Sequence, residues 1–268
     1  DGVVVAHVVG SVPRQTGHVD TDNAVTQTAA FIDDRARDTV TVAGGDAMSY
    51  LQSQIAQEIR DLVVGAARWT LVLDPAGKVD ALARIRRTAD DEFELDTDAG
   101  FGETLQARID RFKIRVDVST TRADAESPSP SVQHELARVG AGWPRMGCEI
   151  EPGVTIPATT GVVPVAVNFQ KGCYPGQEAV AKTHHRGKPP TRLIGLKIEG
   201  DDLPGPGAAV LSGGAEVGRV TSSVRSPYLG GIAALAVVRT SAIENGGPFH
   251  VRTPAGDTPA AIAETPFR

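Results

Sequence analysis

The sequence has few cysteines, no long apolar run and no excess of positive charge, and each shortage excludes a class of protein. Two cysteines in 268 residues, Cys148 and Cys173, cannot build the framework of a disulfide-rich secreted domain. They favour a reducing, cytoplasmic compartment. No apolar run approaches about 18 residues, so we expect no membrane span and no membrane partner. A formal net charge of -6 excludes a global basic field for nucleic acid.

The residues that are present indicate a folded α+β protein. Hydrophobic residues make up 41% of the chain and charged residues 22%, which is enough apolar surface to build a core. β-branched or alternating runs predict strands at 39–43, 69–73, 79–87, 93–96, 114–118 and 165–169. Apolar spacings of three and four predict helices at 46–62, 103–112 and 132–139, and a helical turn at 177–183. A Ser/Pro stretch at 127–131 is typical of an exposed loop.

The character of the sequence changes after residue 187. Short strand-like runs at 192–198, 217–222 and 232–238 alternate with Gly/Pro turns, and helical periodicity is absent. This pattern predicts a small all-β domain such as a barrel. We therefore divide the chain into residues 1–187 and a C-terminal domain at 188–268.

The segment at residues 171–178 is the best candidate for chemistry. Gly172 and Gly176 flank Cys173, and Pro175 stiffens the bend between them. Positive charges nearby would favour the reactive thiolate form of the cysteine. Polar side chains in and just after the segment could hydrogen-bond a planar heterocycle such as a pterin. The alternative is that Cys173 is a small buried apolar side chain in a turn, and the residues alone leave both interpretations open.

Residues 171–178 also resemble the K-G-C-Y/F-x-G-Q-E motif of the folate-binding YgfZ family, relatives of the glycine-cleavage aminomethyltransferase. Residues 44–52 resemble the family's G-x-D-A-x-x-F/Y-L-Q opening, and residues 75–78 resemble its hairpin turn. Further similar stretches lie at 141–149 and 217–222. The resemblance therefore runs from about residue 38 to about residue 240.

The resemblance implies a tetrahydrofolate-binding fold of α/β subdomains around a central cavity, ending in a β-barrel. It implies an accessory role in assembly or repair of iron–sulfur proteins, including those that modify tRNA, so the expected partners are folate, iron–sulfur client proteins and, indirectly, tRNA. Cys173 is the predicted reactive group, with a transient iron–sulfur cluster as a further cofactor beside tetrahydrofolate. The predicted folate-binding residues are Lys171, Tyr174, Gln177, Glu178, Lys182 and Arg186, and no resident metal is expected.

Three features depart from the family pattern. The chain between residues 118 and 132 is shorter than in typical members. Tryptophans that contact folate in some members would align near Arg37 and His134, neither of which is aromatic. The catalytic Asp of the aminomethyltransferase would fall near Glu103, which argues against the glycine-cleavage reaction itself.

Two other functions remain open from the sequence. A folate-dependent methyl- or aminomethyltransferase would use a carboxylate such as Glu103 or Glu178 as its base. A docking module would bind tRNA or an apo-protein through the basic strip at residues 182–188. Cys148 is expected to pack rather than to react, and Glu149 and Glu151 are expected to border the cavity.

Overall fold

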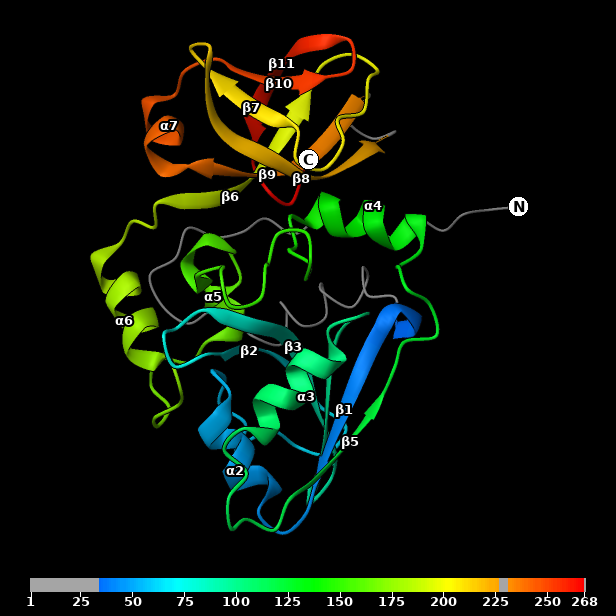
Figure 1. Ribbon diagram of the computed structural model, residues 1–268, viewed down its shortest axis with the longest axis vertical. Helices are drawn as coiled ribbons and strands as arrows, with labels where there is room; N and C mark the ends of the chain where they lie inside the picture. The colour runs from blue at the N-terminus through cyan, green and yellow to red at the C-terminus, as the bar shows by residue number, and fades with distance from the viewer. Residues whose placement is uncertain (1–33, 227–230, 268) are drawn as a thin grey trace.

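The computed structural model describes residues 34–226 and 231–267, and within this part it has two layers (Figure 1). A five-stranded antiparallel sheet with its helices forms the N-terminal layer, a closed six-stranded barrel forms the C-terminal one, and α4 lies between them. The helices are η2 Asp34–Ala36, α2 Ala47–Gln54, α3 Gly102–Asp110, α4 Val132–Ala141, η3 Pro157–Thr159, α5 Val163–Ala166, α6 Gln177–Arg186 and α7 Thr240–Asn245.

The sheet has the strand order β2-β3-β4-β1-β5. Its strands are β1 Arg37–Ala43, β2 Ala67–Leu73, β3 Val79–Ala89, β4 Glu92–Asp98 and β5 Ser119–Ala123. Every second residue of β1 is buried, as expected for a strand with one face on a core. Leu51 of α2 and Leu105 of α3 are fully buried in the same cluster as Phe93 of β4, so both helices help to bury the sheet.

Two predicted strands and the end of one predicted helix are wrong, each for a local reason. The helix from residue 46 ends at Gln54, because Ile55 turns extended and forms a bridge with Val72 of β2. Residues 114–118 are not a strand, because Arg115 takes a positive φ of 55° that breaks an extended run. The expected strand at 165–169 is instead the end of the short helix α5, up to Ala166, and an irregular segment after it. Pro164 lies in the first turn of α5, where a fixed φ suits a helix.

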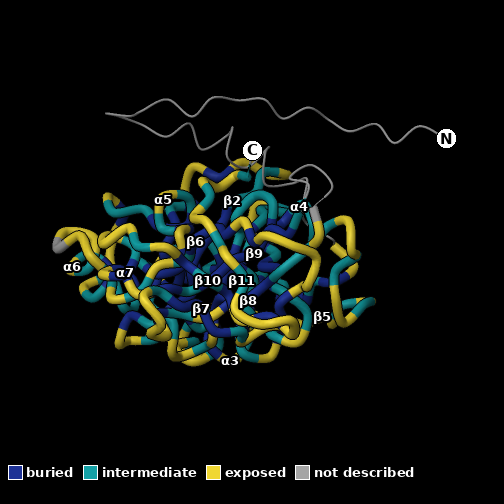
Figure 2. Tube along the Cα trace, turned by 90° about the horizontal axis from the view of Figure 1, so that it is seen from above, coloured by how far each residue is buried: buried dark blue, intermediate teal, exposed yellow. Residues whose placement is uncertain are grey.

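The C-terminal barrel is closed, as the sequence predicts. Its strands are β6 Thr191–Ile198, β7 Ala209–Ser212, β8 Ala215–Ser226, β9 Gly231–Arg239, β10 Phe249–Thr253 and β11 Gly256–Ala263. Pairing of β10 with β7 completes the order β10-β11-β6-β9-β8-β7. In the view onto the barrel, buried stretches gather in the middle and exposed loops at the rim (Figure 2).

Helix α4 joins the two layers. The Ser131 side chain caps its first turn by accepting a hydrogen bond from the backbone N–H of His134, and Gly142 ends it at φ 73°. Val139 of α4 is buried against Ala233 and Leu235 of β9, on the outside of the barrel. No helix in the described ranges has the length and apolar content needed to cross a bilayer.

Candidate functional site

The loop at residues 171–176 is built onto the β2–β3 hairpin turn. Gly176 has a φ of +79°, and a Cβ there would lie 2.6 Å from the carbonyl oxygen of Asp74. A Cβ on Gly77 in the turn would lie 2.5 Å from the Cβ of Ala179. The two glycines therefore allow the loop and the hairpin to meet main chain to main chain, and α6 starts directly from this contact.

Lys171 fastens the same loop to the end of α2. Its Nζ donates to the carbonyl oxygens of Gln52 and Ile55 at 2.7 Å each and of Gln57 at 2.9 Å. The side chain is buried, and burial lowers the pKa of Lys171 to about 8. The ammonium thus faces the main chain. A folate contact by Lys171 stays a prediction, and it would require the ammonium to leave these carbonyls.

The bend leaves Cys173 exposed while the next residue is buried. The exposure excludes the alternative of a buried apolar cysteine. Tyr174 packs in an apolar cluster with Val167 and Val180, and its Oη has no hydrogen-bond partner among the described residues. Burial raises the pKa of Tyr174 to about 12. The loop therefore anchors a tyrosine inward and presents a thiol outward.

The remaining predicted folate-binding residues lie along α6. Gln177 is half-buried, whereas Glu178 and Lys182, one turn apart, are both exposed. Arg186 is the last residue of the helix, and its side chain is outside the described part. α6 thus gathers these residues beside Cys173 in sequence, but whether they bind folate stays a prediction.

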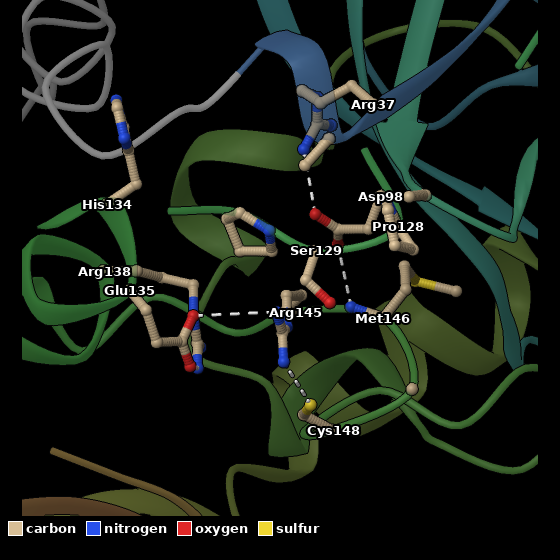
Figure 3. Close-up of a pocket in the computed structure, with 14 residues that line it drawn as sticks. Arg37, Asp98, Pro128, Ser129, His134, Glu135, Arg138, Arg145, Met146 and Cys148 are labelled. Carbon is tan, nitrogen blue, oxygen red and sulfur yellow. Dashed lines mark hydrogen bonds and ion pairs between the residues drawn. The ribbon is translucent and has the colours of Figure 1, made fainter. Parts of the chain in front are cut away.

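A separate cavity of about 170 Å³ lies between the sheet layer and α4 (Figure 3). It is smaller than the about 300–1,000 Å³ typical of sites that enclose a drug-sized ligand, so it suits one end of an extended molecule. Neither Cys173 nor any of the predicted folate-binding residues lines it. The lining includes Arg37, Asp98, His134, Glu135, Arg138, Arg145, Met146 and Cys148.

Two of these lining residues stand where the family resemblance places folate-contacting tryptophans. Arg37 and His134 both line the cavity, from β1 and α4 respectively. The chain's own tryptophans, Trp69 and Trp143, are outside the lining and pack on each other with ring centroids 4.8 Å apart. The Arg37 guanidinium lies 5.4 Å from the Trp69 ring centroid. Arg37, packed on Trp69, therefore stands at a position where the family resemblance predicts an aromatic side chain.

Asp98 at the end of β4 ties the cavity walls together. One carboxylate oxygen accepts from Arg37 Nη1 at 3.0 Å and the other from the backbone N–H of Met146 at 2.9 Å. Both interactions are drawn in Figure 3. Asp98 therefore fixes the loop at 145–148 against the sheet.

Arg138 of α4 forms ion pairs within its own layer and a buried hydrogen bond to the barrel. It donates from Nε to Glu135 at 2.9 Å, from Nη1 to Glu149 at 3.0 Å and from Nη2 to Ser222 of β8 at 2.7 Å. Burial disfavours its charge, but Glu135 and Glu149 outweigh that effect, so the pKa of Arg138 lies above its ordinary value. Glu149, expected to border the cavity, is buried and also accepts from Ser222 in this network.

Arg145 is the lining residue with unused hydrogen-bonding capacity. Its Nη2 donates to Cys148 Sγ at 3.1 Å, and its Nη1 lies 3.7 Å from a Glu135 oxygen. Its Nε is buried and has no partner among the described residues. Cys148, expected only to pack, therefore lines the cavity beside a guanidinium (Figure 3).

The carboxylates proposed for a transferase base lie elsewhere. The Glu103 side chain is 89% exposed, and Glu178 is exposed on α6. Neither lines the cavity. Across the described residues, no group of three or more His, Cys, Asp or Glu side chains is arranged to hold a metal ion.

Sequence reasoning missed the polar centre of the cavity. Arg138, Glu135 and Arg145 come from α4 and the loop after it, and they meet only when this loop folds back on the helix. The available signal was the run at 141–149, whose likeness to the family pattern marked the region without giving roles to its side chains.

Comparison with known proteins agrees with this architecture. Residues 191–268 match the family model of the glycine cleavage T-protein C-terminal barrel domain. The structure resembles a crystal structure of aminomethyltransferase T from Bartonella henselae, with a TM-score of 0.77 and 14% identity, covering 91% of this chain and 89% of that one. The chain therefore has the aminomethyltransferase fold with its C-terminal barrel.

Two curated relatives share sequence over part of their length. The iron–sulfur cluster assembly factor IBA57 of mouse mitochondria is 33% identical over 132 residues, covering 48% of this chain and 36% of that protein. An aminomethyltransferase of Thermus thermophilus is 35% identical over 193 residues, covering 72% of this chain and 48% of that protein. The chain thus spans about half or less of the length of these two relatives.

Proposed function

We propose that this chain, which has the aminomethyltransferase fold, is a YgfZ-type accessory protein that binds a reduced folate and supports iron–sulfur cluster assembly or repair. Its effect on tRNA modification would follow indirectly, through iron–sulfur enzymes that need maintenance. The cavity beneath the barrel is the folate site in this proposal, and Cys173 is the reactive group on the surface. The mouse relative is named for iron–sulfur cluster assembly, which supports the cellular role.

The observation that carries the folate proposal is the buried Nε of Arg145, which has no partner in the described part of the chain. Leaving a buried donor unpaired costs about 1–3 kcal/mol, so a site that keeps one is suited to a ligand acceptor. Folate offers such acceptors on its pterin ring and on its glutamate carboxylates. Tetrahydrofolate, when bound, supplies one-carbon chemistry, and Arg145 with its neighbours would hold one end of the molecule.

The thiol proposal depends on how residues 171–176 are held. Lys171 and Gly176 fix the loop on two sides, to α2 and to the β2–β3 hairpin, while Cys173 stays exposed. A partner protein or a transient cluster could therefore reach the sulfur without rearrangement of the fold. Thiolate sulfur is also the usual protein ligand of iron–sulfur clusters.

The cellular test is complementation of a deletion strain with Cys173→Ser, using the activity of an iron–sulfur enzyme as the readout. We expect at least about a tenfold loss of restored activity at equal protein level, because serine keeps the size of the exposed side chain and removes the sulfur. Val154→Ser, at another exposed position, is the matched control and should restore activity fully. Restoration by Cys173→Ser at the wild-type level would remove the thiol from the proposal.

The folate test is calorimetry on the purified wild-type protein. Tetrahydrofolate should give saturable heat with one ligand per chain. Absence of heat with any reduced folate would contradict folate binding. The proposed role of the Cys173 thiol would still be tested by the complementation experiment.

A further inference from the structure

We propose that Arg145 and Cys148 form the ligand anchor of the cavity. Without ligand, the sulfur of Cys148 accepts a hydrogen bond from Arg145 Nη2, and a bound ligand replaces the sulfur as the acceptor. The ligand feature recognised is a planar pair of adjacent hydrogen-bond acceptors, as in a carboxylate or the acceptor edge of a pterin ring. This inference rests on the proposed function and assigns it a recognition site.

The shape of the arginine supports a paired contact. Nε and Nη2 lie on one edge of the planar guanidinium, and their N–H groups point in parallel, which suits two acceptors side by side. On Arg145, Nε is buried without a partner among the described residues. In the same described part of the chain, Nη2 has the sulfur of Cys148 as its one hydrogen-bond acceptor, at 3.1 Å. Thiol sulfur is a weak acceptor, so a ligand oxygen or nitrogen would strengthen the hydrogen bond of Nη2 and give Nε one that it lacks.

The other cationic groups of the cavity are already engaged. Arg37 donates to Asp98, and Arg138 donates to Glu135, Glu149 and Ser222. Arg145 therefore has the guanidinium edge best able to accept a new partner in this lining. Its contact with Glu135 is longer, at 3.7 Å, and uses Nη1 on the opposite side.

The arrangement makes Cys148 a reporter of occupancy. Cys148 is half-buried and lines the cavity, so a small alkylating reagent can reach it. A ligand held on the Nε–Nη2 edge must lie against the same sulfur and shield it. Cys173 is exposed and outside the cavity lining, so the same ligand should not shield it.

The test compares the two cysteines within one wild-type sample. Iodoacetamide labelling is followed over time, with and without saturating tetrahydrofolate, and read by mass spectrometry after trypsin digestion. Trypsin cuts after Arg145, Lys171 and Lys182, so the two cysteines fall in different peptides, 146–171 and 172–182. We expect tetrahydrofolate to slow labelling of Cys148 at least about tenfold while Cys173, the internal control, keeps its rate.

Two fragments of folate identify which acceptor pair is held. Protection by 6-methyltetrahydropterin assigns the ring edge to Arg145, and protection by p-aminobenzoylglutamate assigns a tail carboxylate. Arg145→Lys keeps the charge and removes the paired donors, so the Kd of tetrahydrofolate should rise at least about tenfold. The thermal melting of this variant shows whether it is folded.

Three results overturn the inference. If tetrahydrofolate gives calorimetric heat yet Cys148 labels at its unliganded rate, the ligand binds elsewhere, and the proposed function survives without this anchor. An unchanged Kd in a folded Arg145→Lys variant has the same meaning. If tetrahydrofolate gives no heat, both the proposed anchor and the proposed folate binding are wrong.

Discussion

At the scale of single residues, Lys171 shows that a positive charge near a thiol in sequence need not serve that thiol. Its ammonium takes up three carbonyl groups left by the end of α2 and the turn after it. A buried ammonium with three acceptors is well satisfied, and removing it leaves those acceptors without a donor. The main consequence of Lys171 is therefore the position of the loop that carries Cys173.

Replacing Lys171 with Met should destabilise the protein by about 2–4 kcal/mol, because the carbonyls of Gln52, Ile55 and Gln57 lose a charged donor. Urea unfolding measures the change. Lys182→Met, at an exposed site on α6, is the control and should stay within about 0.5 kcal/mol. Equal stability of the two variants would show that the Lys171 contacts contribute nothing.

Tyr174 predicts a defined alkaline sensitivity. Its folded pKa is about 12, above the ordinary value of about 10, so between these two values the unfolded chain loses the phenolic proton first. The stability that Tyr174 contributes is thus complete below about pH 10 and lost as the pH approaches about 12.

In Tyr174→Phe, we expect the stability loss between about pH 8 and about pH 11 to shrink by about 1 kcal/mol. At neutral pH the variant should be as stable as wild type or slightly more so, since the Oη has no partner among the described residues. Urea midpoints at both pH values test this. Burial also raises the pKa of Tyr50, so part of the alkaline loss should persist. An identical pH response of variant and wild type would contradict the expectation.

The sequence could locate the loop at 171–178 but could not give the direction of its side chains. The glycines and Pro175 predict a tight bend, and Cys173 is indeed exposed on it. The acceptors of Lys171 come from residues more than a hundred positions earlier, and no local pattern connects the two.

At the scale of elements, the β2–β3 hairpin and the start of α6 form one joint. Gly176 takes a left-handed φ with the Asp74 carbonyl oxygen at 2.6 Å from where a Cβ would stand. A side chain there must both strain the backbone and push against main-chain atoms that cannot rotate away.

Gly176→Ala should therefore cost at least about 2 kcal/mol in unfolding free energy. Gly172→Ala is the matched control in the same loop, because a Cβ at Gly172 meets nothing within 4 Å. Thermal melts of both variants measure the difference. A loss of stability in Gly172→Ala as large as that in Gly176→Ala would refute the explanation by close approach.

Elements with strong local patterns were predicted well, and elements set by distant contacts were not. β2, β3 and α4 match their apolar spacing and turn residues. The apolar spacing of α2 continues through Ile59 and Leu62, although the helix ends at Gln54. Both side chains are buried, because an irregular segment can also place apolar residues at this spacing in the core. Residues 114–118 alternate like a strand but are held to the turn before α2, where the Asp117 N–H donates to the Asp46 carboxylate.

At the scale of the whole molecule, α4 lies between the barrel and the sheet, with the cavity on its sheet side. Arg138 and Glu149 are buried at this junction and meet Ser222 of β8, and the half-buried Glu135 pairs with Arg138. Removing one member of such a buried ionic group leaves the others without compensation. The barrel itself follows from local Gly/Pro turns and short strands, but this junction depends on residues from both layers and could not be derived from one segment.

Arg138→Met should cost about 3–5 kcal/mol and weaken the attachment of the barrel. Arg225→Met is the control, because its partner Asp201 is exposed and surface ion pairs contribute about 0–1 kcal/mol. Urea unfolding gives the stabilities, and limited proteolysis reports separation of the barrel from the sheet layer. Equal effects of the two substitutions would mean that the buried contacts of Arg138 do not hold the layers together.

A crystal structure of the protein grown with tetrahydrofolate shows whether the cavity between α4 and the sheet holds one end of a reduced folate. We expect ligand density in the cavity, with two acceptor atoms within hydrogen-bond distance of Arg145 Nε and Nη2. Folate density elsewhere, for example only along α6 beside Cys173, would contradict it.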